Sequence, residues 1–182
     1  MQTYISFLRG VNMTGHNSIK MTELSAAFLS MGFADAETYI QSGNVIFSDP
    51  GKSLPRIGEQ IEKTILERFG YTIPAMIRTK KELTDLFSAN PFTGEPNFDP
   101  SKQAVIFLHD EPSDAQIQKV AHIDYPPDKF KIIGKEIFIY CPNGFGRTKI
   151  YTNFFENKMG VIGTARNWKT ITTILNIAEN RF

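Results

Sequence analysis

The sequence contains a single cysteine, Cys141, three histidines and no long apolar run. One cysteine excludes an intrachain disulfide, and the scattered histidines give no spacing that suits a metal ion. No run of about 18 apolar residues is present, so we expect no transmembrane helix. The N-terminal segment lacks the basic region and apolar core of a signal peptide. These absences predict a cytoplasmic protein with no metal and no cofactor.

An excess of charge of one sign is also lacking, because 20 Lys and Arg stand against 19 Asp and Glu. Proteins that bind mainly the backbone of duplex nucleic acid usually carry a strong basic excess. The distribution is uneven, however. Residues 91–128 hold two lysines against seven acidic residues, whereas residues 129–182 hold nine Lys and Arg against three glutamates. The basic segment is either a solvated helix face or a local anion-binding patch.

The chain has 182 residues, of which 41% are hydrophobic and fifteen are Phe. This composition supplies a sizeable core, for one large domain or two small ones. In residues 1–90, apolar spacing and turn residues predict a β-α-β-β-α-β order. Pro74 indicates an edge strand, and Thr79 with Glu82 fits a capping box that opens a linking helix to about residue 89. The predicted strands are 2–8, 37–41, 44–48 and 72–78, with helices over 21–31 and 54–69.

Residues 91–182 repeat the same order. The loop over 90–96, rich in Pro and Gly, is the candidate boundary between the two halves. The predicted strands are 103–109, 129–133, 136–141 and 160–164, with helices after Ser113 and over 149–158 and a last helix from about Thr170. The sequence therefore predicts an α/β (α+β) protein with two consecutive ferredoxin-like βαββαβ halves, 1–90 and 91–182, and an extra C-terminal helix.

Several segments together resemble one bacterial family, the domain of unknown function sixteen ninety-seven. They are Leu8 to Asn12 with Gly15, Thr38 to Val45, Tyr140 to Lys149 and Arg166 to Trp168. The resemblance spans nearly the whole chain and implies an α/β fold in a mainly bacterial, cytoplasmic protein. It implies no activity. The family often has two glycines where this chain has Thr14 before Gly15, which weakens any phosphate-cradling role for the first loop.

Two segments of the first half combine polar side chains with glycine. Arg9 and Asn12 follow the first strand, at the end where ligands often sit in α/β folds. Gln41, Ser42 and Asn44 surround a hairpin glycine. They either form a simple turn, or the side-chain amides of Gln41 and Asn44 hydrogen-bond a base or sugar.

The second half contributes the basic candidates. Arg147 and Lys149 follow two glycines, near a predicted helix start that favours anions. Arg166, Asn167 and Trp168 precede the last helix, where Asn167 is a candidate cap. Trp168 either packs the helix start onto the core or offers an aromatic plate, with Arg166 contacting phosphate.

Catalytic groups are scarce. Cys141 is expected to be a buried apolar residue, and His16, His109 and His122 stand apart from any nucleophile or carboxylate pair. Whether the protein is an enzyme therefore stays open.

The favoured hypothesis is a nucleotide-like, phosphate-bearing ligand bound at a basic cleft between the halves. RNA is the weaker branch, since no RNP-type sequence is present. The alternatives are a small enzyme acting on a phosphorylated substrate, or a scaffold that binds partner proteins. The candidate ligand-binding residues are Arg9, Asn12, Gln41, Ser42, Asn44, Arg147, Lys149, Arg166, Asn167 and Trp168.

Overall fold

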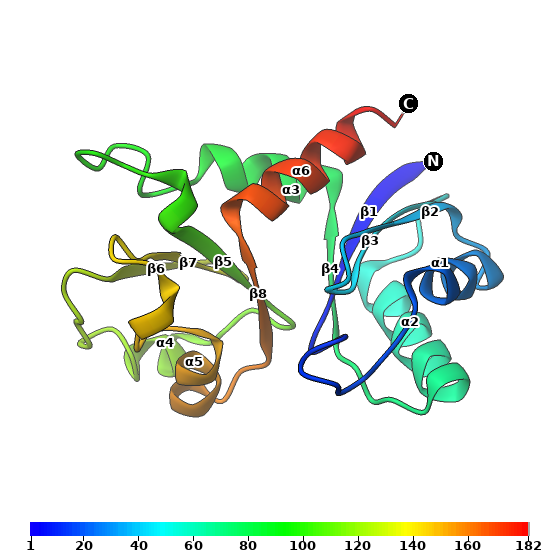
Figure 1. Ribbon diagram of the computed structural model, residues 1–182, viewed down its shortest axis with the longest axis horizontal. Helices are drawn as coiled ribbons and strands as arrows, with labels where there is room; N and C mark the ends of the chain where they lie inside the picture. The colour runs from blue at the N-terminus through cyan, green and yellow to red at the C-terminus, as the bar shows by residue number, and fades with distance from the viewer. Residues whose placement is uncertain (182) are drawn as a thin grey trace. The chain divides into compact units, whose positions relative to one another are not determined.

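The computed structural model describes residues 1–181 and divides into two compact units (Figure 1). The first unit contains residues 1–86 together with the segment from Ile174 onward, and the second contains residues 87–173. The predicted division at residue 90 assigned that C-terminal segment to the second half instead.

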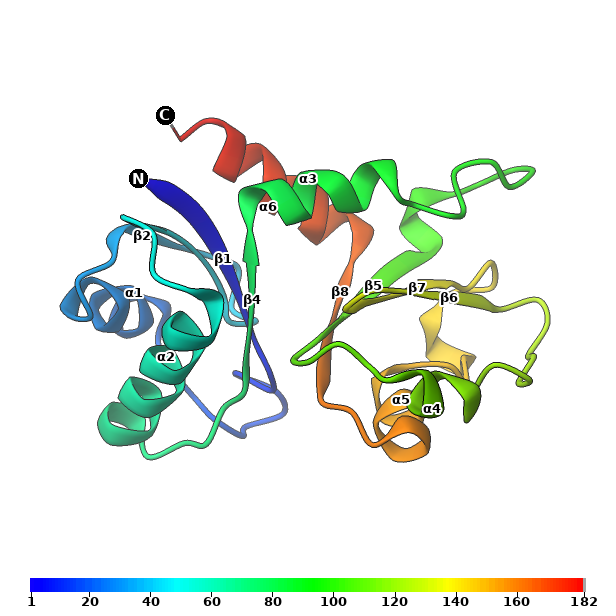
Figure 2. The same cartoon turned by 180° about the vertical axis from the view of Figure 1, so that it is seen from behind.

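The first unit follows the predicted β-α-β-β-α-β order. Its four strands form an antiparallel sheet in the order β2-β3-β1-β4, which leaves β2 and β4 at the edges. Both helices lie on one face of this sheet (Figures 1 and 2). The edge position predicted from Pro74 is thus confirmed for β4. The elements are β1 (Gln2–Leu8), α1 (Met21–Ser30), β2 (Ala34–Tyr39), β3 (Asn44–Asp49), α2 (Leu54–Phe69) and β4 (Ala75–Thr79).

The second unit repeats this topology. Its antiparallel sheet has the order β6-β7-β5-β8, again with two helices on one face (Figure 2). Two ferredoxin-like halves are therefore confirmed. The elements are β5 (Gln103–Leu108), α4 (Asp114–Gln118), β6 (Lys129–Ile133), β7 (Glu136–Tyr140), α5 (Thr152–Met159) and β8 (Gly163–Asn167), with α3 (Lys80–Ser88) before them and α6 (Trp168–Glu179) after them.

Local sequence explains where several helices begin and end. In α2, Ile57, Ile61 and Ile65 recur at every fourth position and are fully buried, and Gly70 ends the helix with φ +76°. The capping box predicted for α3 is confirmed, because the Glu82 carboxylate accepts from the Thr79 backbone N–H at 2.7 Å and the Thr79 hydroxyl accepts from the Glu82 N–H at 3.1 Å.

Two predicted elements of the second half begin three residues later than predicted, and the last helix, predicted from about Thr170, begins at Trp168. The helix predicted over 149–158 begins at Thr152, after a 3-10 turn over Phe145–Arg147, and the strand predicted over 160–164 is β8, Gly163–Asn167. Pairing with β5 explains the second shift. A side chain at Gly163 would place its Cβ 2.7 Å from Ile106 Cγ2, so only glycine fits where β8 begins. Arg166 and Asn167 therefore belong to strand β8, directly before the last helix.

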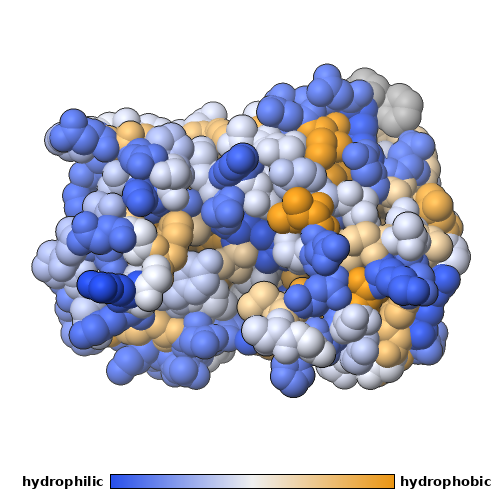
Figure 3. All heavy atoms as spheres, viewed as in Figure 1, coloured by the Kyte–Doolittle hydropathy of each residue, from blue (hydrophilic) through white to orange (hydrophobic). Residues whose placement is uncertain are grey.

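No helix within residues 1–181 is long and apolar enough to cross a membrane. On the face drawn in Figure 3, apolar residues are interspersed with polar ones. The apolar side chains instead gather beneath the helices, where each sheet has its own buried cluster. That of the first unit includes Leu24, Phe28, Phe47, Ile57 and Ile61, and that of the second includes Ile106, Leu108, Ile137, Ile139 and Phe155.

Candidate functional site

The first glycine loop is held together by the side chain of Asn12. Asn12 has φ +53°, and its Nδ2 donates to the carbonyls of Ile19 and Gln41, both at 2.9 Å. Its Oδ1 accepts from the Ile19 N–H at 2.9 Å. The bond to Gln41 joins this loop to the hairpin between β2 and β3. The structure thus brings two of the predicted segments together within one unit.

The hairpin side of this contact depends on Gly43 and Asn44. The carbonyl of Gly43 accepts from the Leu8 N–H at 2.9 Å. Asn44 is fully buried, and its Nδ2 donates to the Tyr39 carbonyl at 3.1 Å and to Ser42 Oγ at 2.9 Å. The side-chain amides of Asn12 and Asn44 therefore stabilise the backbone. The Gln41 side chain is exposed, so its amide is more accessible to a ligand than the other two.

Arg9 is half-buried where β1 ends, and its backbone N–H donates to the Pro74 carbonyl at 3.0 Å. Ser42 is also half-buried and accepts from Asn44. The first unit thus contributes a compact polar cluster. That this cluster forms one basic cleft with the loops of the second half stays a prediction.

In the second unit, residues 142–149 form the basic glycine loop. The turn closes with a bond from the Gly144 N–H to the Cys141 carbonyl at 2.8 Å, and Gly144 has φ +85°. Arg147 and Lys149 are both exposed. Lys102, from the segment before β5, brings a third cation, because its Nζ lies 3.9 Å from the position that a Gly144 Cβ would take. Since α5 begins only at Thr152, the predicted helix start does not adjoin Arg147.

Aromatic rings flank this loop. The Lys149 Nζ lies 5.4 Å from the centre of the Tyr125 ring, a cation–π distance. The Phe145 and Tyr151 rings lie 5.9 Å apart.

Cys141, at the start of the loop, is fully buried, as the sequence predicted. Burial raises the pKa of its thiol to about 11, although the bond to Thr148 Oγ1 opposes the shift. The thiol is therefore protonated at neutral pH, and both its burial and its protonation disfavour nucleophilic attack by the sulfur.

Arg166 lies near the end of β8 with only 8% of its surface exposed. Its Nη1 donates to Thr164 Oγ1 and to the Ala165 carbonyl, both at 2.8 Å. Burial lowers its pKa to about 10, which still leaves the guanidinium charged at neutral pH. Its hydrogen bonds to the chain show a structural role that the sequence did not reveal.

The two residues after Arg166 shape the start of α6. Asn167 is the predicted cap, and its Oδ1 accepts from the Thr170 N–H at 2.8 Å. Trp168 is 9% exposed, and its ring centre lies 4.6 Å from that of Phe87. Packing of the helix start thus occupies most of the Trp168 surface and leaves little for a ligand.

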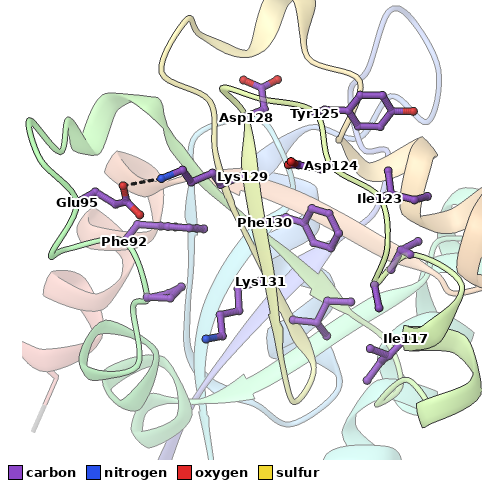
Figure 4. A pocket seen from close by; sticks show the side chains of 14 residues that line it. Phe92, Glu95, Ile117, Ile123, Asp124, Tyr125, Asp128, Lys129, Phe130 and Lys131 are labelled. Atoms are coloured by element: carbon purple, nitrogen blue, oxygen red, sulfur yellow. Dashed lines mark hydrogen bonds and ion pairs between the residues drawn. The ribbon is translucent and has the colours of Figure 1, made fainter.

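Sequence reasoning missed a pocket of about 680 Å³ in the second unit (Figure 4). It lies around the edge strand β6, between residues 91–95 on one side and residues 117–128 on the other. Figure 4 shows Lys129 pointing toward Glu95, while Phe130 points to the opposite side, toward Ile123. The lining residues are Pro91, Phe92, Glu95, Ile117, Val120, Ala121, Ile123, Asp124, Tyr125, Asp128, Lys129, Phe130, Lys131 and Ile132.

One signal in the sequence could have indicated this pocket. The strand Lys129–Ile133 begins with alternating lysine and apolar residues, which is typical of a strand with one wet face. Its position at an edge depends on the sheet order, which the sequence does not display.

The aromatic residues of β5 and β7 offer no exposed surface on which the bases of an RNA could stack. Phe107 and Phe138 are 0% and 1% exposed. Tyr140 packs against Phe92 and Phe98, with ring centres 5.7 and 5.4 Å away. Within residues 1–181, no group of three or more His, Cys, Asp or Glu side chains is placed to hold a metal ion.

Fold and sites together define an α/β protein of two ferredoxin-like units, each with its own polar loop cluster. Residues 1–138 match the family described as Protein of unknown function (DUF1697), and the chain belongs to that family. A solved structure of a conserved bacterial protein from Streptococcus pneumoniae is similar, with a TM-score of 0.79 and 20% identity over 99% of each chain. At this identity the likeness shows the fold alone. No curated protein matches the sequence.

Proposed function

We propose that this protein binds a phosphate-bearing, nucleotide-like ligand through the basic glycine loop over residues 142–149. The observation that carries the proposal is the presence of three cations at one loop. Arg147 and Lys149 belong to this loop, and Lys102 lies beside its positive-φ glycine, Gly144. Within residues 1–181, no carboxylate lies within ion-pair distance of these three cations. A phosphate would supply the missing negative charge.

The side chains of this loop suit the two parts of a nucleotide. A guanidinium presents a planar fork to phosphate oxygens, whereas a lysine ammonium acts as a point charge. Tyr151 is 39% exposed beside the loop, so its ring offers a stacking surface for a base. Because Arg166 is buried and already hydrogen-bonded, the proposal assigns the phosphate to Arg147 and Lys149 rather than to Arg166.

The test is a double substitution, Arg147→Ala with Lys149→Ala, assayed by thermal shift with pyrophosphate, AMP and ADP. A ligand at about 100 times its Kd stabilises the folded protein by about 2.7 kcal/mol. That free energy raises the melting temperature of a chain of this size by roughly 5–10 °C. We expect the parent to show this rise with at least one probe, and the double variant to lose it.

The matched control is Lys119→Ala with Lys158→Ala, which removes the same charge from exposed positions elsewhere in the second unit. We expect this control to keep the rise. A double variant that binds every probe as the parent does would rule out the proposal. Turnover of a bound nucleotide in the same samples would identify an enzyme rather than a binding protein.

A further inference from the structure

We propose that the open edge of β6 is a docking site for one extended segment of another protein, which adds to the second sheet as an antiparallel strand. This proposal concerns the backbone edge of β6, which adjoins the basic glycine loop at Tyr125, and it does not rest on ligand binding in that loop. It is carried by the backbone of β6, by the pocket around the strand and by the charges that line it.

The hairpin geometry determines which backbone groups of β6 point outward. Gly134 and Lys135 form a two-residue turn, and Ile133 pairs with Glu136 across it. In such a hairpin the pair that flanks the turn exchanges both hydrogen bonds, and bonded pairs then alternate along the ladder. The N–H and C=O groups of Phe130 and Ile132 therefore point away from β7, toward the open edge.

Within residues 1–181, no backbone or side-chain group outside the sheet bonds to these outward groups of Phe130 and Ile132. The corresponding edge strand of the first sheet, β2, is different. It has a register shift between Ala34 and Glu37, and the Arg181 guanidinium donates to the Asp35 carbonyl at 2.6 Å. Bulges and covering side chains are the usual protection of an edge strand. β6 pairs with β7 over five residue pairs without a register shift, and among the described residues it has neither a bulge nor a covering side chain.

The pocket provides room for the side chains of an added strand on both faces of the sheet. On the helix face, Phe130 and Ile132 lie among Ile117, Val120 and Ile123 and are only half-buried. An added strand would complete the burial of this apolar surface with apolar residues directly opposite Phe130 and Ile132.

The opposite face is charged. Lys129 is paired with Glu95 at 2.6 Å, whereas Lys131 has no ion-pair partner within residues 1–181 (Figure 4). An acidic residue directly opposite Lys131 would supply that partner. Beyond the N-terminal end of β6, Asp124 and Asp128 line the pocket and favour a basic residue. The occupant is therefore an extended segment with apolar residues at alternate positions, an acid between them and a basic residue near one end.

A second copy of this chain fits the edge poorly. The antiparallel register that pairs the whole strand with itself places Lys129 opposite Ile133 and Lys131 opposite Lys131. Like charges directly opposite one another destabilise a sheet. The lysines thus disfavour self-pairing, while they favour an acidic strand from a different protein.

The test uses capped peptides and the full-length protein labelled for NMR. The probe reads, from its N-terminus, threonine, valine, glutamate, valine, threonine and lysine, which places the valines opposite Ile132 and Phe130 in the antiparallel register. We expect saturable binding, with the largest shifts and slowed hydrogen exchange at the Phe130 and Ile132 amides. Antiparallel pairs exchange bonds through directly opposite residues. N-methylation of both valines should therefore weaken binding at least tenfold, whereas N-methylation of the glutamate and of the second threonine should change it less than threefold.

A charge reversal in the protein gives an independent readout. Lys131→Glu should weaken the glutamate probe by about three- to tenfold and should favour a probe that carries lysine in place of the glutamate. An unfolded variant is recognised by its own spectrum, and the methylated peptides then test the proposal on the parent protein. Three outcomes would overturn it: no binding at millimolar peptide, equal binding of both methylated probes, or a chain that dimerises through β6 in sedimentation velocity.

Discussion

Gly43 lies where the hairpin between β2 and β3 meets the end of β1. Its φ is +74°, and an added Cβ would stand 2.9 Å from Leu8 Cβ and 3.0 Å from Val11 Cγ2. Gly15, in the neighbouring loop, has φ +81° but nothing within 4 Å of its Cβ position. The two glycines therefore share the same backbone constraint and differ in the space around them.

We predict that Gly43→Ala destabilises the protein by about 2–4 kcal/mol, since it combines left-handed strain with overpacking. Gly15→Ala should cost only the strain, about 1 kcal/mol. The free energy of unfolding in urea measures both. Equal losses at the two positions would mean that the contact with β1 relaxes without cost.

Residue type alone did not show which arginines are available to a ligand and which have a structural role. Arg147 is exposed, whereas Arg166 is 8% exposed and donates to two oxygens of its own strand. The guanidinium of Arg147 is thus a candidate ligand contact, whereas that of Arg166 is a structural hydrogen-bond donor. Burial makes this distinction, and burial depends on contacts with residues far along the chain.

At the scale of elements, α3 depends on the cap that precedes it. The Thr79 hydroxyl accepts from the Glu82 N–H and donates to the Glu82 carboxylate at 2.8 Å. We predict that Thr79→Ala costs about 1 kcal/mol, because it leaves a helix N–H without its acceptor. Thr79→Ser should restore most of the loss in chemical denaturation.

The control for this prediction is Thr84→Ala on the same helix. Its hydroxyl donates to the Lys80 carbonyl at 3.0 Å, which is already an acceptor within the helix, so its removal should be nearly neutral. A cost at Thr84 that equals the cost at Thr79 would assign the effect to helix propensity rather than to capping.

Element order was predictable from the sequence because its signals are local. The isoleucines of α2, the cap at Thr79 and the turn at Gly134 each act over about one helical turn or one hairpin. The start of β8 was not predictable in this way. Val161 and Ile162 are typical of a strand, yet pairing with β5 begins at Gly163, where the Ile106 side chain of β5 already occupies the space that a Cβ would need.

At the scale of the whole molecule, the C-terminal segment returns to the first unit. The Arg181 Nη1 donates to the carbonyls of Asp35 and Ile46 at 2.6 and 3.0 Å, and Nη2 pairs with Glu37 at 2.6 Å. These bonds join a residue near the end of the chain to the sheet made by its beginning. The first unit is therefore discontinuous in sequence, while the second is a single segment.

We predict that Arg181→Ala lowers the stability of the first unit by about 1–3 kcal/mol, because two backbone carbonyls and a carboxylate lose a charged donor. Hydrogen exchange should become faster for amides of β2 and β3 and stay unchanged for amides of β6 and β7. Arg56→Ala, at an exposed position of α2, is the matched control and should change neither. A uniform increase over both sheets would instead indicate one cooperative unit.

The sequence by itself determined the doubled β-α-β-β-α-β order, most helix ends and the burial of Cys141, because periodicity, caps and turn residues act between near neighbours. Only the tertiary structure decided that Arg166 is buried, that Asn12 and Asn44 stabilise the first loop cluster, and that β6 stands at an edge beside a pocket. Those properties come from pairing and packing between distant segments. The sequence therefore predicts the two amphipathic halves, whereas their candidate binding surfaces follow only from the tertiary structure.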